Sequence, residues 1–197
     1  MQKIPTLFKR DPEDMRQVLP EIIPGCEWVL AGDGVPTRKY DGTCCMLDEH
    51  GEWWARREVK PDKQTPPNFQ ASEHDETTGK TVGWIPMHDS DFKKWHAEAI
   101  ENSKLLSGAV FPFLPGTYEL CGPKVNGNPE GFENHRLVSH DGAEVINLER
   151  LSFPMNMAYA HGAFEMLLVT MLPYEGIVWH HPDGRMAKLK RRDFPQS

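Results

Sequence analysis

The sequence lacks any long apolar run. A membrane-spanning helix needs roughly 20 consecutive, predominantly apolar residues, and no stretch of the chain approaches that length. The first residues, MQKIPTLFKRDPEDM, also lack the continuous apolar segment of a signal peptide. We therefore expect an intracellular, cytoplasmic protein that makes no use of a membrane.

The chain also lacks an excess of basic residues. It has 22 Lys and Arg against 29 Asp and Glu, which gives a formal net charge of -7. Non-specific affinity for nucleic acid comes from clustered cations that neutralise phosphates. This charge argues against a protein that coats nucleic acid, so any RNA would bind at a local patch.

Cysteine is scarce. Cys26, Cys44, Cys45 and Cys121 form no pair of C-x-x-C sequences, and the adjacent Cys44 and Cys45 would point to opposite faces of a strand. We expect reduced thiols rather than a zinc site or a disulfide framework.

The patterns that are present predict an α+β fold with largely antiparallel sheets, because strand-like and helix-like segments follow one another without regular alternation. Residues 38–47 and 52–59 read as strands joined by the turn 48–51, which predicts a hairpin. Helices are expected at 90–106 and 157–171. Further strands are expected at 116–121, 136–140, 176–180 and 185–190.

Two segments carry weaker patterns. A short helix is expected at residues 12–19, within an entry segment that covers residues 1–25. Residues 60–81 contain three prolines and few apolar anchors, so we expect a mobile loop there.

Four short motifs follow one another along the chain. They are K-x-D-G at residues 39–42, Glu119 in the expected strand 116–121, E-G-x-V at residues 175–178, and K-x-K at residues 188–190. Each alone is weak, since K-x-D-G arises often by chance and a lone strand glutamate usually faces solvent. Together, in this order, they resemble the motifs of the covalent nucleotidyltransferases: the ATP-dependent DNA and RNA ligases and the mRNA capping enzymes.

The words KYDGTCC, GWIP and TYELCGPKVNGNPEG look closest to the small 5′-to-3′ RNA ligases of vertebrates and their relatives. The resemblance spans residues 39–192 and implies a nucleotidyltransferase fold. We expect residues 1–197 to form a single domain of this kind, without an appended oligonucleotide-binding domain. Cys44 stands where the DNA-ligase pattern K-x-D-G-x-R has its arginine, which disfavours a DNA ligase.

The resemblance implies that Lys39 is the nucleophile, whose amine attacks the α-phosphate of ATP. A free lysine amine is only about one part in a thousand deprotonated at neutral pH, so neighbouring cations would favour the attacking form. Strand alternation over residues 185–192 places Lys188, Lys190 and Arg192 on one face. In the ligases the two lysines bind the α-phosphate and stabilise the transition state. The alternative reading of this basic run is a solvated tail.

Other residues acquire nucleotide-binding roles from the resemblance. Glu119 would accept hydrogen bonds from a ribose hydroxyl. An arginine of the second hairpin strand, Arg57 or Arg56, would contact the ribose or the RNA 3′ end. His140 is our candidate for stacking on adenine, with Phe132 as a weaker one, although neither matches the family well and His140 as an ordinary strand histidine is an equal alternative.

A divalent cation, Mg²⁺ or Mn²⁺, is also implied. Glu175 resembles the metal-binding glutamate of the family, since hard oxygen ligands suit Mg²⁺. Asp41, two residues after Lys39 and expected on the same strand face, would orient the amine or a hydrated metal. Its alternative role is to hold the turn into Gly42. His161, His180 and His181 have no ligand spacing and are expected to be structural or close to RNA.

The predicted function is an ATP-dependent RNA ligase that joins 5′-phosphate and 3′-hydroxyl RNA ends, with ATP and RNA ends as its partners. Two alternatives remain at this point. One is another covalent nucleotidyltransferase, namely a DNA ligase or a capping guanylyltransferase. The other is a non-catalytic module that binds a nucleotide or an RNA end.

Overall fold

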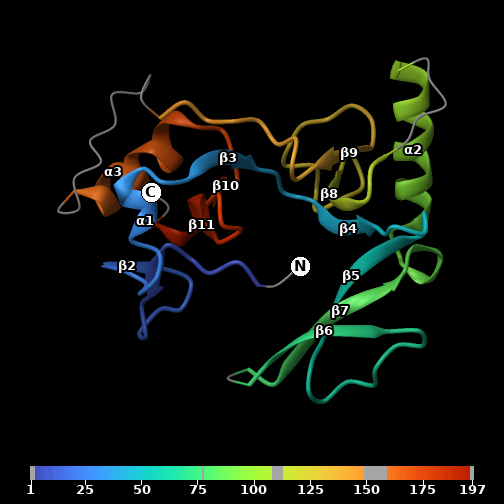
Figure 1. Ribbon diagram of the computed structural model, residues 1–197, viewed down its shortest axis with the longest axis horizontal. Helices are drawn as coiled ribbons and strands as arrows, with labels where there is room; N and C mark the ends of the chain where they lie inside the picture. The colour runs from blue at the N-terminus through green and yellow to red at the C-terminus, as the bar shows by residue number, and fades with distance from the viewer. Residues whose placement is uncertain (1–2, 77, 108–112, 149–158, 196–197) are drawn as a thin grey trace. The chain divides into compact units, whose positions relative to one another are not determined.

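The computed structural model describes residues 3–76, 78–107, 113–148 and 159–195 (Figure 1). The chain divides into two compact units: unit 1 consists of Met1–Lys3 and Asp41–Gly142, and unit 2 consists of Ile4–Tyr40 and Ala143–Ser197. A single catalytic domain over residues 1–197 stays a prediction. Within the described ranges, no helix has the length and apolar character needed to cross a membrane.

Unit 2 contains two small antiparallel sheets (Figure 1). The first pairs β1 (Phe8–Arg10) with β2 (Val18–Ile22). The second has the order β11-β10-β3, formed by Met186–Lys190, Gly176–His180 and Val35–Lys39. Its helical elements are α1 (Trp28–Ala31), α3 (Ala160–Met166), the π-helical turn η3 (Leu167–Met171) and the 3-10 turn η4 (Arg191–Asp193).

The three-stranded sheet of unit 2 buries one face and leaves the other for polar side chains. Ile177, Trp179, Ala187 and Leu189 are at most 1% exposed and belong to the same apolar core as the helical residues Phe164, Leu167 and Leu168. Burial of each large apolar side chain contributes roughly 1.5–3 kcal/mol. Because side chains alternate along a strand, the residues between these core positions face the other side.

Unit 1 is built on a six-stranded antiparallel sheet of order β6-β7-β5-β4-β8-β9 (Figure 1). Its strands are β4 (Thr43–Leu47), β5 (Trp53–Val59), β6 (Gln70–Asp75), β7 (Lys80–Pro86), β8 (Gly116–Cys121) and β9 (Arg136–Ser139). The helical elements are the short η1 (Met87–Asp89) and the longer α2 (Lys93–Ser107).

One face of this sheet forms the core of unit 1 with α2. Cys45, Leu47 and Ala55 from the central strands, together with Tyr118 and Leu120 of β8, pack with apolar residues of the helix and of η1. The register pairs Cys44 with Glu119, which places these two side chains on the opposite face. The sheet therefore has a core face, covered by α2, and a second face that carries Glu119.

Most of the expected elements are confirmed. The fold is α+β with antiparallel sheets, and the hairpin of β4 and β5 is present. α2 overlaps the expected helix 90–106 and ends one residue later, and α3 lies within the expected helix 157–171, of which residues 157–158 lie outside the described ranges. All four cysteines carry thiols that form no disulfide bond.

Three expectations are wrong. Residues 12–19 form no helix; they contain turns and the start of β2. The expected loop 60–81 includes β6 and the start of β7. The expected strand 38–47 is interrupted after Lys39, and its two parts, β3 and β4, pair in different sheets.

Candidate functional site

Lys39 and Lys190 lie in one row across the three-stranded sheet of unit 2. Gly176 is the register partner of Lys39 on one side and of Lys190 on the other. Directly opposed residues share a face, and a glycine contributes no side chain between them. Both amines are therefore free to converge above Gly176.

Glu175 joins the two lysines. Its Oε2 accepts a hydrogen bond from the Lys39 amine, and its Oε1 forms an ion pair of 2.8 Å with the amine of Lys190. The three side chains are only 12–20% exposed. The backbone carbonyl of Glu175 also accepts the Arg191 N–H at 2.7 Å, which fixes this residue just before β10.

The charges in this cluster are not balanced. One carboxylate faces two ammonium groups, so the cluster of Lys39, Glu175 and Lys190 carries a net positive charge inside an acidic chain. Burial acts to raise the pKa of Glu175, but the ion pairs with Lys39 and Lys190 outweigh it and lower that pKa below its ordinary value. A cluster of this kind attracts an anion such as a phosphate.

Lys188 lies on the same face, two residues before Lys190. It pairs in register with Val178, while its two neighbours, Ala187 and Leu189, are fully buried in the core. The alternation expected for residues 185–192 is thus present over Met186–Lys190. It does not extend to Arg192, because β11 ends at Lys190 and the chain turns into η4.

The glycines of two motifs are required by close packing. A Cβ on Gly176 would collide with the Leu189 carbonyl oxygen of the neighbouring strand. In unit 1, a Cβ on Gly42 would collide with the Leu120 carbonyl oxygen and approach Cys121 Sγ. Both positions bring two backbones closer than any larger residue allows.

Glu119 of unit 1 is held at both oxygens. Its Oε1 accepts the Gly42 N–H at 3.1 Å, and its Oε2 lies 3.1 Å from Nε2 of His140. His140 Nδ1 lies 2.8 Å from Thr117 Oγ1, two residues before Glu119 on β8. Glu119 is 8% exposed, and its two contacts fix the orientation of the carboxylate. A carboxylate fixed in this way can accept a hydrogen bond from a hydroxyl group.

His140 therefore lies beside Glu119 rather than alone on a strand. Both of its ring nitrogens are engaged, so it is placed to orient the carboxylate. The other stacking candidate, Phe132, has the guanidinium of Arg136 over its ring at 4.0 Å. Neither arrangement tests the adenine-stacking role.

Asp41 lies beyond the end of β3 and belongs to unit 1, so strand alternation does not relate it to Lys39. Its N–H donates to Glu130 Oε1 at 2.8 Å, and its Oδ1 accepts from the Asn126 amide at 3.0 Å. Asn126 also donates to the Gly42 carbonyl at 2.7 Å. The segment GPKVNGNPEG thus holds the second half of the K-x-D-G motif.

Arg57 lies on the opposite side of the sheet from Glu119. β5 pairs Ala55 with the core residue Cys45, and Arg57 shares the face of Ala55. Arg56, its neighbour, shares the face of Cys44 and Glu119. The register therefore makes Arg56, rather than Arg57, the arginine on the side of Glu119.

Unit 2 contains a cluster of side chains around Arg38 that the sequence did not indicate. The guanidinium of Arg38 lies 4.5 Å from the ring centre of Tyr40 and 4.3 Å from that of Tyr174. Glu144 accepts the Tyr174 hydroxyl at 3.0 Å and pairs with Arg38 at 3.4 Å. These contacts support the residues on either side of Lys39 and Glu175 from the other face of the sheet.

A preformed cage for a metal is absent from the described ranges, which contain no group of three or more His, Cys, Asp or Glu side chains suited to an ion. Mg²⁺ is often held by one or two carboxylates together with substrate phosphates. The single carboxylate of Glu175, which lies between the amines of Lys39 and Lys190, is compatible with that mode of binding.

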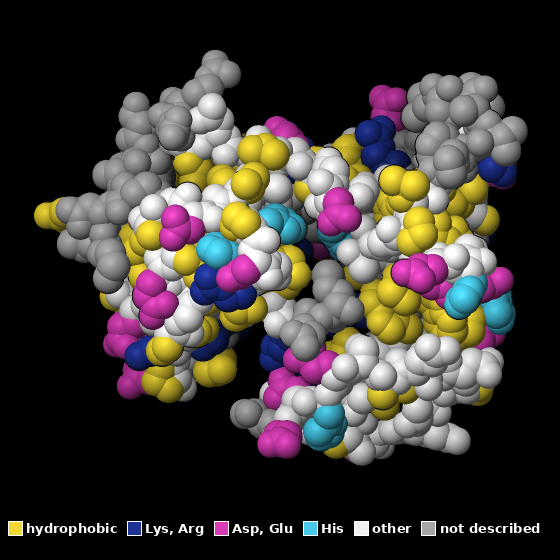
Figure 2. All heavy atoms as spheres, in the orientation of Figure 1, with side chains coloured by type: hydrophobic (Ala, Val, Ile, Leu, Met, Phe, Trp, Pro, Cys, Tyr) yellow, Lys and Arg dark blue, Asp and Glu magenta, His cyan; other side chains and the backbone are white. Residues whose placement is uncertain are grey.

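On the face that Figure 2 displays, Lys and Arg side chains are dispersed among Asp and Glu and form no broad basic area.

The chain is similar to curated proteins named RNA ligase 1, and no protein-family model matches it. The protein of Pongo abelii is 25% identical over 264 aligned positions, covering 96% of this chain and 79% of the relative. That of Danio rerio is 25% identical with the same coverage. That of Rattus norvegicus is 26% identical over 81% of this chain and 66% of the relative.

Proposed function

Because the chain is related in sequence to the RNA ligase 1 proteins of vertebrates, as its motif words predict, we propose that it is an ATP-dependent RNA ligase with a nucleotidyltransferase fold. It joins 5′-phosphate and 3′-hydroxyl RNA ends through a covalent lysyl-AMP on Lys39. The observation that carries this proposal is the row of Lys39, Gly176 and Lys190 with Glu175 between the two amines.

In the first step, Lys39 Nζ attacks the α-phosphorus of ATP. The N–P bond forms as the bond from that phosphorus to the pyrophosphate oxygen breaks, and the ammonium group of Lys39 gives up two of its three protons to become a phosphoramidate N–H. In the structure, Glu175 binds the ammonium form of Lys39. The attacking amine must therefore leave Glu175 before the bond forms.

Lys190 and Lys188 are the cations on the same face as the nucleophile. Charge grows on the non-bridging oxygens of the α-phosphate during the displacement. Fixed ammonium groups stabilise this charge without reorganising, which is the largest catalytic contribution in many phosphoryl-transfer sites.

Glu175 is the residue that would hold a divalent cation together with substrate phosphates. When bound, Mg²⁺ would neutralise charge on the phosphate oxygens. Separation of the Glu175 carboxylate from the two amines would release Lys39 for attack and Lys190 for binding of the phosphate.

Glu119 is assigned separately, within unit 1, as the group that accepts a hydrogen bond from a ribose hydroxyl. The Gly42 N–H and His140 fix its two oxygens, which leaves their remaining lone pairs for the ligand.

In the later steps AMP passes from Lys39 to the RNA 5′-phosphate, and a 3′-hydroxyl displaces AMP.

The proposal is tested by incubating the protein with ATP or GTP labelled at the α-phosphate and Mg²⁺, followed by a denaturing gel. We expect a covalent label from ATP that Lys39→Ala abolishes and that Lys9→Ala, at an exposed lysine of unit 2, leaves intact. A label retained by Lys39→Ala would overturn the assignment of the nucleophile. Labelling by GTP alone would indicate a capping enzyme, and no label at all would indicate a binding module.

Ligation assays then test the substrate class. A 5′-phosphorylated RNA should be joined more efficiently than a DNA of the same sequence. Equal joining of the two would overturn the assignment to RNA.

A further inference from the structure

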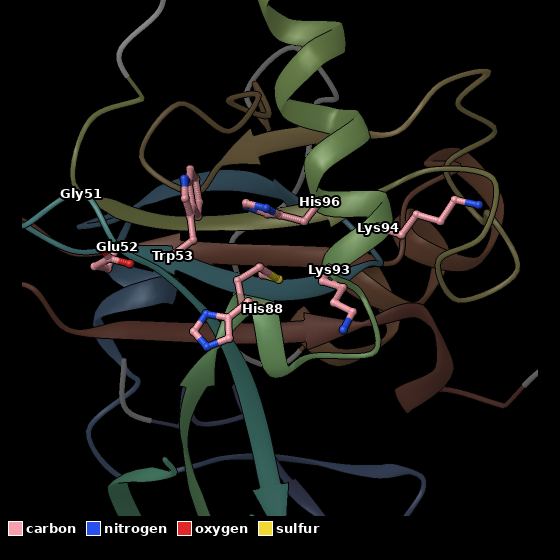
Figure 3. A pocket seen from close by; sticks show the side chains of 8 residues that line it. Gly51, Glu52, Trp53, His88, Lys93, Lys94 and His96 are labelled. Carbon is pink, nitrogen blue, oxygen red and sulfur yellow. The ribbon is translucent and has the colours of Figure 1, made fainter. Parts of the chain in front are cut away.

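Unit 1 contains a pocket that none of the assigned residues lines (Figure 3). Its volume is about 450 Å³, within the range of roughly 300–1,000 Å³ that small-ligand sites occupy. It lies between the β4–β5 turn, η1 and the first turns of α2. Trp53, which lines it, pairs with Leu47 on the core face of the sheet, opposite to Glu119.

The pocket contains a buried polar atom without a partner. His96 is 5% exposed, and its Nε2 has no hydrogen bond within the described part of the chain. Figure 3 shows the His96 ring extending from α2 towards Trp53, and the two ring centres are 4.5 Å apart at 66°. A buried polar atom left unsatisfied is destabilising, so its presence beside a cavity points to a ligand that completes it.

The protonation state of His96 suits a neutral ligand group. Burial lowers the pKa of its imidazole to about 4, so the ring is uncharged at neutral pH. A neutral imidazole offers one donor and one acceptor nitrogen. The polar edge of a heterocycle provides the complementary groups.

Apolar surface adjoins this histidine. Met87 is 6% exposed, and the half-buried Trp53 ring is fixed by edge contacts with Phe113 and a tilted contact with Tyr118. An immobile indole and a thioether beside a cavity accommodate a planar aromatic group. Bases of single-stranded RNA are recognised by such contacts.

The rim of the pocket carries charged side chains. Two lysines, Lys93 and Lys94, and one carboxylate, Glu52, line it together with His88. Lys94 Nζ lies over the Trp95 ring at 4.6 Å, and in Figure 3 its side chain points away from the pocket. Lys93 is the first residue of α2, where the positive end of the helix dipole adds to its charge. An anionic group is therefore favoured beside Lys93.

The three features of the pocket suit a ligand that has a planar ring, a polar edge on that ring and an attached anionic group. A nucleotide has all three. We propose that this pocket binds one nucleotide of an RNA strand, with its base against Trp53 and His96 and a phosphate beside Lys93. The choice of RNA over a free nucleoside monophosphate rests on the proposed function, and the experiment separates the two.

The test measures binding of a fluorescent single-stranded oligoribonucleotide by the 197-residue protein, comparing His96→Leu and Lys93→Glu with the parent. Leucine fills the same buried space and removes the unpaired nitrogen, so His96→Leu should keep or raise the thermal midpoint while weakening RNA binding roughly fivefold. Lys93→Glu should weaken binding at low salt and reduce the slope of log K against log salt by about 0.7, the value for one phosphate contact on a single strand.

Lys104→Glu is the matched control, since it makes the same charge change at the other end of α2 and should leave RNA affinity within twofold. Unchanged RNA binding in both pocket variants would overturn the proposal, and Lys93→Glu decides the outcome if His96→Leu fails to fold. Titration with AMP, GMP, CMP and UMP forms the second arm. Binding of these mononucleotides that His96→Leu abolishes, with RNA affinity unchanged, would replace RNA by a free nucleotide.

The readout does not require Lys39, because RNA binding is measured directly. Covalent labelling of the parent protein by ATP is an independent assay of the proposed function. A protein that fails to label but loses RNA affinity in the pocket variants would disprove the ligase and retain the nucleotide pocket.

Discussion

Lys190 Nζ lies 2.8 Å from Glu175 Oε1, and the other oxygen of this carboxylate binds Lys39. One acidic side chain thus holds two cations on the same sheet face before any substrate is present. Removing that charge has consequences for stability as well as for chemistry.

We expect Glu175→Gln to lower the free energy of unfolding by about 2 kcal/mol, because it leaves two mostly buried ammonium groups facing each other. Urea denaturation at pH 7 measures the change. The exposed pair of Lys9 and Glu21 provides the control, and Glu21→Gln should change stability by less than about 0.5 kcal/mol. Equal effects of the two substitutions would contradict the coupling described for Glu175.

The same carboxylate predicts a pH dependence. Its pKa is lower in the folded protein than its ordinary value of 4.5, so its contribution to stability is complete above pH 4.5. That contribution is lost as the pH falls from 4.5 through the folded value. Comparing the parent with Glu175→Gln between pH 3 and 7 should reveal a smaller acid dependence in the variant.

The motif glycines predict a packing effect. Gly42→Ala and Gly176→Ala should each destabilise the protein by about 2–3 kcal/mol, since a methyl group would meet a carbonyl oxygen of the adjacent strand. Gly162 in α3 has nothing near its Cβ position, so Gly162→Ala should be neutral or stabilising by up to about 1 kcal/mol. Thermal unfolding of the three variants checks this order.

The network around Glu119 predicts a change in nucleotide selectivity. If Glu119 accepts a hydrogen bond from a ribose hydroxyl, Glu119→Gln should reduce kcat/KM for ATP in self-adenylylation by roughly ten- to a hundredfold. One of the two analogues 2′-deoxyATP and 3′-deoxyATP lacks the hydroxyl that Glu119 binds, and for that analogue the loss should be smaller. His140→Ala should reduce the same selectivity, because it frees Glu119 Oε2.

His140→Gln, which keeps a donor near Glu119, should recover part of the selectivity. A purely structural role for His140 would lower activity with all three nucleotides by the same factor. The ratio between ATP and its deoxy analogues is therefore the decisive quantity.

His96 predicts a second pH effect, over a different range. Burial lowers its pKa from 6.5 to about 4, so the unfolded chain binds more protons than the folded one between these values. Stability is complete above pH 6.5 and falls as the pH drops towards 4, by at most roughly 3 kcal/mol. The other ionisable side chains that line the same pocket are Glu52, His88, Lys93 and Lys94. His96→Leu should remove this dependence, which urea denaturation at pH 7 and pH 5 would measure.

Elements with a strong local pattern were predictable from the sequence. The strands Gly116–Cys121 and Gly176–His180 have the expected bounds, since each combines β-branched or aromatic residues with flanking turn residues. β6 was not predictable, because Gln70–Asp75 has almost no apolar residue and is an edge strand held by its pairing with β7.

The interruption of the expected strand 38–47 after Lys39 results from long-range strand pairing. Residues 38–47 are uniformly compatible with a strand, but β3 pairs with β10 and β4 pairs with β8, so the chain leaves one sheet and enters another. The order of motifs indicated Lys39, Glu175 and Lys190 together. It could not indicate that Asn126 binds Asp41, because those side chains meet across 85 positions.

The row of Lys39, Gly176 and Lys190 has a consequence for biosynthesis. Lys39 and Glu175 are separated by 136 positions, and β3 has no partner in its sheet until β10 has been made. Closing so long a loop is slow, because the chain loses entropy before the contacts between β3 and β10 form. A nascent chain that stops before β10 therefore carries Lys39 without its partners, so incomplete translation products should be unable to trap a nucleotide.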